Sequence, residues 1–203
     1  MSIKAATAKG VATRESIIER AYRMVRKDGF EGLSIGGVAD AVGMSKSGVF
    51  AHFGSREDLQ LAVLEASVQQ FSENVFAPAL RERRGLARLR VLMQGSLEWM
   101  SSETGGCPLV SAAVQYDDRP GPIRDAVAAY QKRLRKELVR AIQMAIDSGE
   151  LRADTDAAQL AFQFFAIELA VHHDAHLFAR APALERGRRA LDAALAACRS
   201  SHH

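Results

Sequence analysis

Residues 34–53, SIGGVADAVGMSKSGVFAHF, constrain the fold of this chain more than any other stretch. Ser34 is a candidate N-cap, because its hydroxyl can accept a hydrogen bond from a free N–H of the first helical turn. Gly43 is a candidate helix stop, because glycine tolerates the left-handed backbone conformation. Ser45 can then cap a second short helix. The residues that follow Ser34 at helical spacing give one apolar face: Ile35, Val38, Ala39 and Val42.

Two capped helices joined by a glycine turn form a helix-turn-helix pattern. In DNA-binding proteins of this kind, the second helix enters the major groove with its N-terminal residues at the base edges. Here that helix is expected from Lys46 to about His52, and it opens with a charge, a hydroxyl and a glycine: Lys46, Ser47 and Gly48. An ordinary helical hairpin has the same capping pattern, so these residues alone leave both interpretations open.

The flanking residues extend this pattern in a fixed order. An amphipathic segment follows Thr13, a candidate N-cap, and stops at Asp28 and Gly29. The ordered features are Ala21 to Gly29, Leu33-Ser34, Val38-Ala39, Val42-Gly43-Met44-Ser45, Phe50-x-His52-Phe53 and Ser55-Arg56-Glu57-Asp58-Leu59. Over about residues 13–64, the chain resembles the N-terminal domain of the TetR (tetracycline-repressor) family of bacterial transcription regulators.

The resemblance implies an all-α fold in two parts and a role in transcription. It predicts a flexible basic arm at 1–12, a three-helix DNA-binding domain at 13–55 and a ligand-binding and dimerisation domain at 56–203. The last two helices, expected at about 155–178 and 182–198, would form the homodimer interface. The family default is a repressor that binds a palindromic double-stranded operator and is released by a small-molecule effector, here of unknown identity.

The resemblance also implies which residues contact DNA. Lys46, Ser47 and Gly48 are expected at base edges, and the residues expected to hold phosphates are Ser34, Ser45, His52 and Arg56. In the family, position 50 is usually a tyrosine that contacts a phosphate. Here Phe50 lacks that hydroxyl, and we expect it only to pack. Gly36 and Gly37 each cost about 1 kcal/mol in a helix, so we expect them to permit a close approach by backbone or a neighbouring helix.

The charge distribution agrees with a DNA-binding N-terminus. Residues 1–56 hold nine Lys and Arg against five Asp and Glu, whereas the remaining residues hold 18 against 19. Positive charge therefore concentrates around the helix-turn-helix, as phosphate binding requires, and Lys4 and Lys9 add charge to the arm. Neither a run of about 18 apolar residues nor a signal sequence is visible, so we expect a cytoplasmic protein that spans no membrane.

The C-terminal part is expected to contain a ligand cavity among its helices. A long helix is predicted from Ser55 towards Pro78, then a helix through the arginine-rich run 81–90, and further helices at 108–116 and from Pro122 to Gly149. Cavities for small molecules are mostly apolar or aromatic with a few polar groups. The candidates of that kind are Phe76, Met93, Trp99, Met100, Val110, Tyr116, Tyr130, Phe165, Glu168 and His172.

Two alternatives remain open at this point. His172 and His176 lie four residues apart on one helix face, which suits a metal-sensing regulator, although no glutamate completes an H-E-x-x-H motif. Cys107 with a histidine would suit a hydrolase, but the chain has no Gly-rich phosphate loop and no G-x-S-x-G motif. Cys107 and Cys198 lack zinc-type spacing and are interpreted as reduced thiols. We therefore expect a regulator without enzymatic activity or a cofactor.

Overall fold

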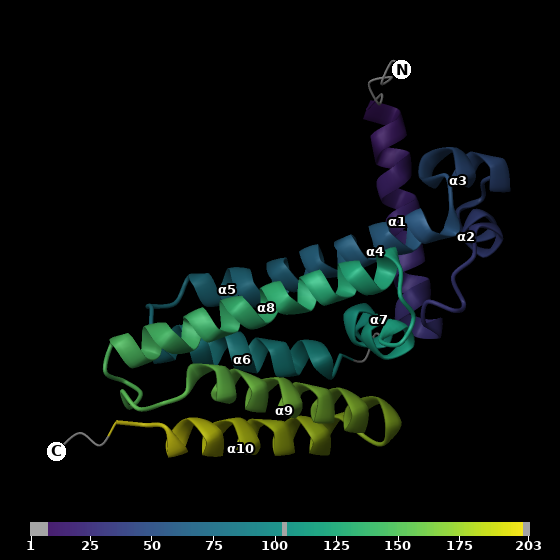
Figure 1. The fold of residues 1–203 in the computed structure, drawn as a ribbon. Coiled ribbons are helices and arrows are strands. Elements are labelled where there is room, and N and C mark those ends of the chain that lie inside the picture. The colour runs from purple at the N-terminus through teal and green to yellow at the C-terminus, as the bar shows by residue number, and fades with distance from the viewer. Residues whose placement is uncertain (1–7, 103–104, 201–203) are drawn as a thin grey trace.

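The computed structural model describes residues 8–102 and 105–200, and its regular elements there are helices, apart from one isolated antiparallel bridge between Leu151 and Arg199. The predicted all-α class is confirmed (Figure 1). No helix in the described ranges is long and apolar enough to cross a membrane. The elements are α1 (Ala8–Asp28), α2 (Ile35–Val42), α3 (Lys46–Phe53), α4 (Arg56–Phe71), the π-helix η1 (Ser72–Phe76), α5 (Ala77–Leu80), α6 (Leu86–Met100), α7 (Pro108–Tyr116), α8 (Pro122–Asp147), α9 (Ala157–Leu177) and α10 (Arg180–Ala197).

Serine side chains cap the short helices of the N-terminal unit, as the sequence predicts. The Ser34 hydroxyl accepts a hydrogen bond from the Gly37 N–H at 3.0 Å, and the Ser45 hydroxyl accepts one from the Gly48 N–H at 3.1 Å. Gly43 ends α2 with a left-handed φ of 70°. Because α2 and α3 have eight residues each, and isolated helices of that length are marginal, the caps fix where they begin.

The first helix begins earlier than predicted. Thr13 is not an N-cap: it lies inside α1, and its Oγ1 donates a hydrogen bond to the Lys9 carbonyl at 2.8 Å. A threonine inside a helix can satisfy its hydroxyl in this way, on the carbonyl four residues back. The second half of the segment predicted as an arm, from Ala8 on, is therefore helical, whereas Lys4 lies outside the described residues.

The long helix predicted from Ser55 continues past Pro78, but in three pieces. Ser55 caps α4 by accepting from the Asp58 N–H at 2.9 Å, and η1 then adds a wider turn before α5. Pro78 lies in the first turn of α5, where a missing N–H costs least. The arginine-rich run is not one helix, because Gly85, with a φ of 103°, separates a turn from α6.

The C-terminal body is built around α6, which packs against α5, α8, α9 and α10. In Figure 1, α8, α6, α9 and α10 follow one another from the middle of the molecule to its lower edge. Pro108 and Pro122 open α7 and α8, as predicted. α9 begins at Ala157 and is capped by Asp156, not Asp154, and α10 begins at Arg180, two residues before Pro182.

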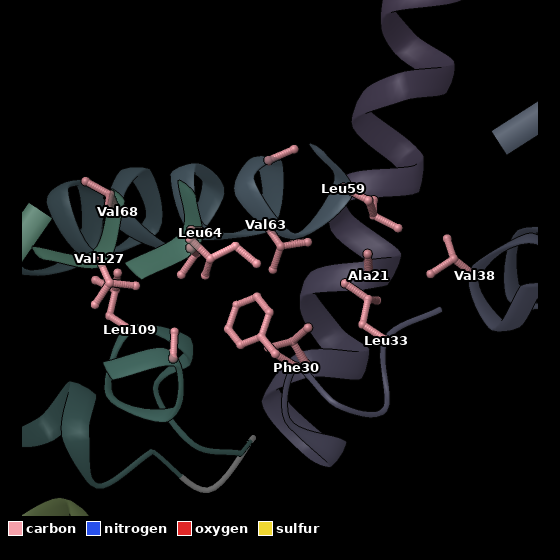
Figure 2. Close-up of a cluster of buried hydrophobic side chains, with 14 of the residues drawn as sticks. Ala21, Phe30, Leu33, Val38, Leu59, Val63, Leu64, Val68, Leu109 and Val127 are labelled. Carbon is pink, nitrogen blue, oxygen red and sulfur yellow. The ribbon is translucent and has the colours of Figure 1, made fainter. Parts of the chain in front are cut away.

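Two clusters of buried side chains stabilise the fold. The first joins α1, α2 and α3 to α4 and α7, and Phe30, in the turn after α1, lies at its centre near Leu64 and Leu109 (Figure 2). The second cluster lies within the body, between α6, α8, α9 and α10. Trp99 and Leu134 pack against both clusters. The N-terminal helices α1 to α3 and the body therefore share a continuous apolar contact.

Candidate nucleic-acid interface and internal cavity

The N-terminal end of α3 lies on the surface of the molecule. Lys46 and Ser47 are exposed, and Gly48 is half-buried. The Ser45 and Ser47 hydroxyl oxygens are 3.1 Å apart, so one hydroxyl donates to the other. With Ile35 and Phe50, Lys46 and Ser47 line a shallow concavity on the outer face of α2 and α3. This end of the helix therefore presents a charge, a hydroxyl and a small apolar surface together.

Glycines in the two short helices make room for these side chains. A Cβ added at Gly36 would lie 3.0 Å from Lys46 Cε, so Gly36 allows the lysine stem to cross α2. A Cβ at Gly37 would lie 3.2 Å from Ser34 Oγ, and one at Gly48 would lie 3.2 Å from Ser45 Oγ. Gly36 therefore serves the approach of a side chain from the neighbouring helix, while Gly37 and Gly48 leave space around the caps.

The residues expected at phosphates differ in what already holds them. Ser34 and Ser45 accept backbone hydrogen bonds as caps. His52 is half-buried beside the Phe53 ring, at 6.4 Å between ring centroids. Arg56 has an unexpected structural role, because its guanidinium donates to three carbonyls of the turn before α2, those of Phe30, Glu31 and Leu33, at 3.0, 3.0 and 2.6 Å.

Phe50 does not pack in the core, which corrects the expectation for this position. Its side chain is 55% exposed on the outer face of α3, whereas Val49 and Phe53 face inward. Three- to four-residue spacing along α3 places Phe50 on the face that carries Lys46. An exposed ring at this place offers apolar contact to a sugar or a thymine methyl, a type of contact found in the major groove.

The body contains a narrow apolar cavity of about 50 Å³ between α4, η1, α6, α7, α8 and α9. A cavity volume of about 10–15 Å³ holds one water molecule, so this cavity has room for only a few waters. Its lining residues are Phe71, Phe76, Leu92, Met93, Ser96, Met100, Cys107, Leu109, Val110, Gln131, Leu134, Arg135, Leu138, Phe165 and Glu168. Six of the ten residues named from the sequence are in this lining: Phe76, Met93, Met100, Val110, Phe165 and Glu168.

Four polar residues are in the cavity lining, Ser96, Gln131, Arg135 and Glu168, and of these Ser96 and Glu168 lie close to each other. Burial raises the pKa of Glu168 to about 7, and the nearby Ser96 hydroxyl opposes this rise only in part. The Ser96 side chain is buried, and its Oγ has no hydrogen-bond partner within the described residues. A carboxyl group that titrates near neutral pH inside an apolar cavity is a common property of functional sites.

α1 contacts the wall of this cavity through Arg26. The guanidinium donates to Ser102 Oγ and to the Gly105 carbonyl, each at 3.0 Å, and the Gly106 N–H donates to the Arg26 carbonyl at 3.1 Å. Gly105 has a φ of 115°, and a Cβ there would lie 2.5 Å from the Arg26 carbonyl oxygen. Because Cys107 follows this loop and lines the cavity, the contact joins the cavity wall to α1 and so to the N-terminal helices.

Comparison with known families identifies this architecture. A family model described as "Bacterial regulatory proteins, tetR family" matches residues 17–63, and one described as "Tetracyclin repressor-like, C-terminal domain" matches residues 85–191. The chain belongs to the TetR family. The resemblance found in residues 13–64 is thus confirmed, and the protein is a transcriptional regulator with a helix-turn-helix DNA-binding domain.

Individual relatives of this TetR-family chain agree with the family assignment. The HTH-type transcriptional repressor AcnR of Corynebacterium glutamicum is 28% identical over 157 residues, which cover 74% of each chain. A TetR transcriptional regulator from Chloroflexus aurantiacus is 26% identical, with a TM-score of 0.85 over 94% of this chain and 97% of that one. AibR, solved with isovaleryl coenzyme A and operator DNA, is 24% identical, with a TM-score of 0.66 over 79% and 85%.

Four residues named from the sequence lie outside the cavity lining of this TetR-family body. Trp99 packs edge-on against Phe71, at 5.9 Å between ring centroids. Tyr116 accepts a hydrogen bond from Gln60 at 3.1 Å, and Tyr130 packs against the first hydrophobic cluster. The fourth, His172, lies behind the cavity and accepts a hydrogen bond from the Cys107 N–H at 3.3 Å. The sequence pattern could not separate lining residues from these neighbours.

The histidine pair is engaged by the protein backbone. The rings of His172 and His176 are 4.7 Å apart, but Nε2 of His172 faces the Cys107 N–H, and Nε2 of His176 lies 3.2 Å from the Met100 carbonyl. Within the described residues, no group of three His, Cys, Asp or Glu side chains could hold a metal ion. Burial and the neighbouring histidines lower the pKa of His172 to about 4, so its ring is neutral at physiological pH.

Cys107 lacks the environment of a nucleophile. Its side chain is buried, and burial raises the pKa of the thiol above its ordinary value. Reactive cysteines are instead partly exposed and have a lowered pKa, because the thiolate is the reacting species. His172 accepts a hydrogen bond from the Cys107 backbone N–H, so its ring supports the backbone at Cys107 and does not contact the thiol through this bond.

Proposed function

We propose that a homodimer of this chain binds a palindromic operator in the cytoplasm, represses neighbouring genes and is released by a small molecule in the body cavity. The observation that carries this proposal is the exposed N-terminal end of α3, held by the Ser45 cap on a unit that is packed against a cavity-containing body. The repressor name of the AcnR relative supports the direction of regulation.

The proposed DNA contacts follow from exposure and chemistry. Lys46, Ser47 and the close backbone approach at Gly48 would meet base edges in the major groove. Ser34, Ser45 and His52 would contact flanking phosphates, which position the protein without reading sequence. Arg56 would hold the turn before α2 through its three hydrogen bonds to carbonyls. Its guanidinium keeps its positive charge and would also attract a phosphate. AibR, a protein of similar fold, was solved with operator DNA, and this supports operator binding by the present chain.

The proposed dimer uses α9 and α10. Phe162 and Leu169 are exposed and lie seven residues apart, on one face of α9, and Leu177 and Phe178 are exposed where the helix ends. Contiguous exposed apolar side chains on a soluble domain usually mark an interface. Dimerisation also suits the operator, because two recognition helices can then enter major grooves about 34 Å apart.

Release of the protein from operator DNA would follow because the cavity is narrow. A ligand of more than a few atoms must move the walls, and these include Phe71 of α4 and Phe76 of η1. The other end of α4 begins at Arg56, which holds the turn before α2, so a shift of α4 reaches the recognition helices. A coupling free energy of about 1–3 kcal/mol, common in allosteric proteins, would weaken operator binding roughly 5- to 150-fold.

Selection of DNA from random duplexes tests the proposal. The purified full-length chain is mixed with random duplexes at near-physiological salt, and bound sequences are read after several rounds. A palindrome with half-sites about one helical turn apart is the expected product. The logarithm of its affinity should fall linearly with the logarithm of the salt concentration. If no palindrome is enriched, and if the affinity of the protein for duplex DNA does not depend on salt, the proposal is overturned.

A further inference from the structure

The structure points to the chemical class of the effector: an apolar molecule that carries a cationic nitrogen, which we propose pairs with Glu168. This inference rests on the proposed function, because it takes the cavity as the effector site. It is carried by the placement of two polar groups, Glu168 of α9 and Ser96 of α6, in a lining that is mostly apolar and aromatic and whose other polar residues are Gln131 and Arg135 of α8.

The cavity has one polar position suited to a ligand head group. Ser96 is only 2% exposed, and its Oγ has no hydrogen-bond partner among the residues that the structure describes. The Ser96 hydroxyl does act on the Glu168 carboxyl, whose pKa it lowers, but it makes no hydrogen bond of normal length, and a buried hydroxyl in that state costs free energy unless a ligand or a water satisfies it. Because the Ser96 hydroxyl lies close to the Glu168 carboxyl, one ammonium group, with several N–H donors, can reach both.

The charged and titratable groups around Glu168 do not supply its counter-charge. Burial is the main cause of its raised pKa, and no basic side chain in the described chain offsets it. Arg135 of α8 also lines the cavity, but its side chain is exposed and its guanidinium lies over the Phe165 ring, 4.2 Å from the centroid. One turn further along α9, burial and the neighbouring histidines keep the His172 ring neutral, and burial raises the pKa of the Cys107 thiol above its ordinary value.

A cation is the head group that this arrangement favours. An anionic ligand would bring a second negative charge to Glu168 in a medium of low dielectric, where like charges repel strongly. A neutral alcohol could hydrogen-bond to Ser96 or to the carboxylate but would leave the carboxylate without a counter-charge. An ammonium or amidinium group would make charge-assisted hydrogen bonds to the carboxylate, and the phenyl rings of Phe71, Phe76 and Phe165 would receive its apolar part.

Three probes that differ only in the head group test this inference. They are 4-phenylbutylamine, 4-phenylbutanol and 4-phenylbutyrate, and their affinities for the full-length protein are measured by calorimetry at pH 8. The amine should bind at least about tenfold more tightly than the alcohol and the carboxylate. In Glu168→Gln, the affinity of the amine should exceed that of the alcohol and the carboxylate by less than about threefold. The preference for the amine should persist in Glu137→Gln, which removes a carboxylate from α8 outside the cavity lining.

Proton linkage gives a readout that non-specific apolar binding would lack. Because Glu168 must ionise to pair with the amine, and its pKa is about 7, the amine should bind about tenfold more tightly at pH 8 than at pH 6. The alcohol should show no such dependence. Glu168→Gln should remove the pH dependence while the variant keeps its folded circular-dichroism spectrum.

The outcomes separate this inference from the proposed function. Equal binding of the amine and alcohol, or tighter binding of the carboxylate, would overturn the cationic class and leave the cavity as a ligand site. If none of the three probes binds, the inference of a cationic, apolar effector is overturned as well. Neither result bears on operator selection, which uses no ligand and tests the regulator directly.

Discussion

The DNA-binding unit and the C-terminal body are stabilised in different ways. Side-chain caps open α2, α3 and α4, where Ser34, Ser45 and Ser55 each accept a backbone N–H. In the body, α6, α7, α8 and α10 begin without a cap from the preceding side chain, and only α9 has one, from Asp156. The first α6 N–H is instead satisfied from across the body, at 2.9 Å from the Glu150 carboxylate.

Helix length accounts for the contrast at α2 and α3, which have eight residues each, but not at α4, which has 16 residues and a cap, or at α7, which has nine and no side-chain cap. Helices of two turns gain little from burial, so they depend on local capping residues, whereas long helices are stabilised by the apolar face that they bury. The recognition unit is consequently fixed in detail by neighbouring residues in the sequence. The body is fixed by contacts between distant helices, and this leaves room for a cavity and for residues such as Glu168 that do not add stability.

Loss of Phe30 should have the largest effect, because the two regions meet there. Phe30→Ala removes a fully buried ring between α1, α4 and α7 and should lower the free energy of unfolding by about 3–5 kcal/mol, measured by urea denaturation. Phe50→Ala is the matched control, since its ring is mostly exposed, and should cost no more than about 0.5 kcal/mol. Similar losses in both variants would show that the regions are not joined through this ring.

Glu168 should make the body more stable in acid than at neutral pH. Its folded-state pKa is raised from an ordinary value near 4.5 to about 7, so the folded protein favours the protonated form. The resulting stability is complete below pH 4.5, declines as pH rises, and is lost once pH passes about 7. Glu168→Gln should therefore be more stable than the wild type by about 3 kcal/mol at pH 8, with the difference shrinking towards pH 4.5. A stability difference between the two proteins that does not change with pH would contradict the raised pKa of Glu168.

Arg26 tests the second connection between the regions. Arg26→Ala removes the hydrogen bonds to Ser102 and Gly105 and should lower the free energy of unfolding by about 2 kcal/mol. Hydrogen exchange at the Gly106 amide, which donates to α1, should accelerate in the same variant. Arg20→Ala, an exposed site on α1, is the control and should leave both measurements unchanged. Unaltered exchange at Gly106 in the Arg26 variant would argue against the connection.

The smallest effect is expected at a cap. Ser45→Ala should destabilise α3 by about 1 kcal/mol, because the Gly48 N–H loses its acceptor. Amide exchange in α3 should accelerate while exchange in α6 and α9 stays as in the wild type. Ser47→Ala, which removes the exposed hydroxyl that shares a hydrogen bond with Ser45 Oγ but leaves the Gly48 N–H its acceptor, serves as the comparison. Acceleration throughout the chain would mean that the cap stabilises more than its own helix.

Sequence reasoning succeeded where local chemistry decides the structure. Ser34, Gly43 and Ser45 could be assigned because a cap or a stop needs only its neighbours along the chain. Thr13 was assigned wrongly for a related reason: threonine can cap a helix or bond to the carbonyl four residues back, and only the helical segment before it selects between these states. Phe50 was expected to pack, but its neighbours along α3 turn it outward.

Contacts between distant segments could not be obtained from the pattern. Arg26 looks like any basic residue near a helix end, and nothing in its surroundings indicates the loop around Gly105. Glu168 was named as a cavity residue, but Ser96 was not, because serines in helices are common and only the packing of α6 against α9 brings the two together. The separation of lining residues from their neighbours, such as Trp99, likewise depends on three-dimensional packing.

Operator binding by Lys46→Ala tests the central claim, that the N-terminal end of α3 contacts the bases. On the palindrome obtained by selection, this variant should bind about tenfold or more weakly than the wild type while keeping the oligomeric state of the wild type by analytical ultracentrifugation. Lys132→Ala, which removes an exposed charge from α8, should bind as the wild type does. Equal affinity of Lys46→Ala and the wild type would contradict the assignment of α3 as the recognition helix.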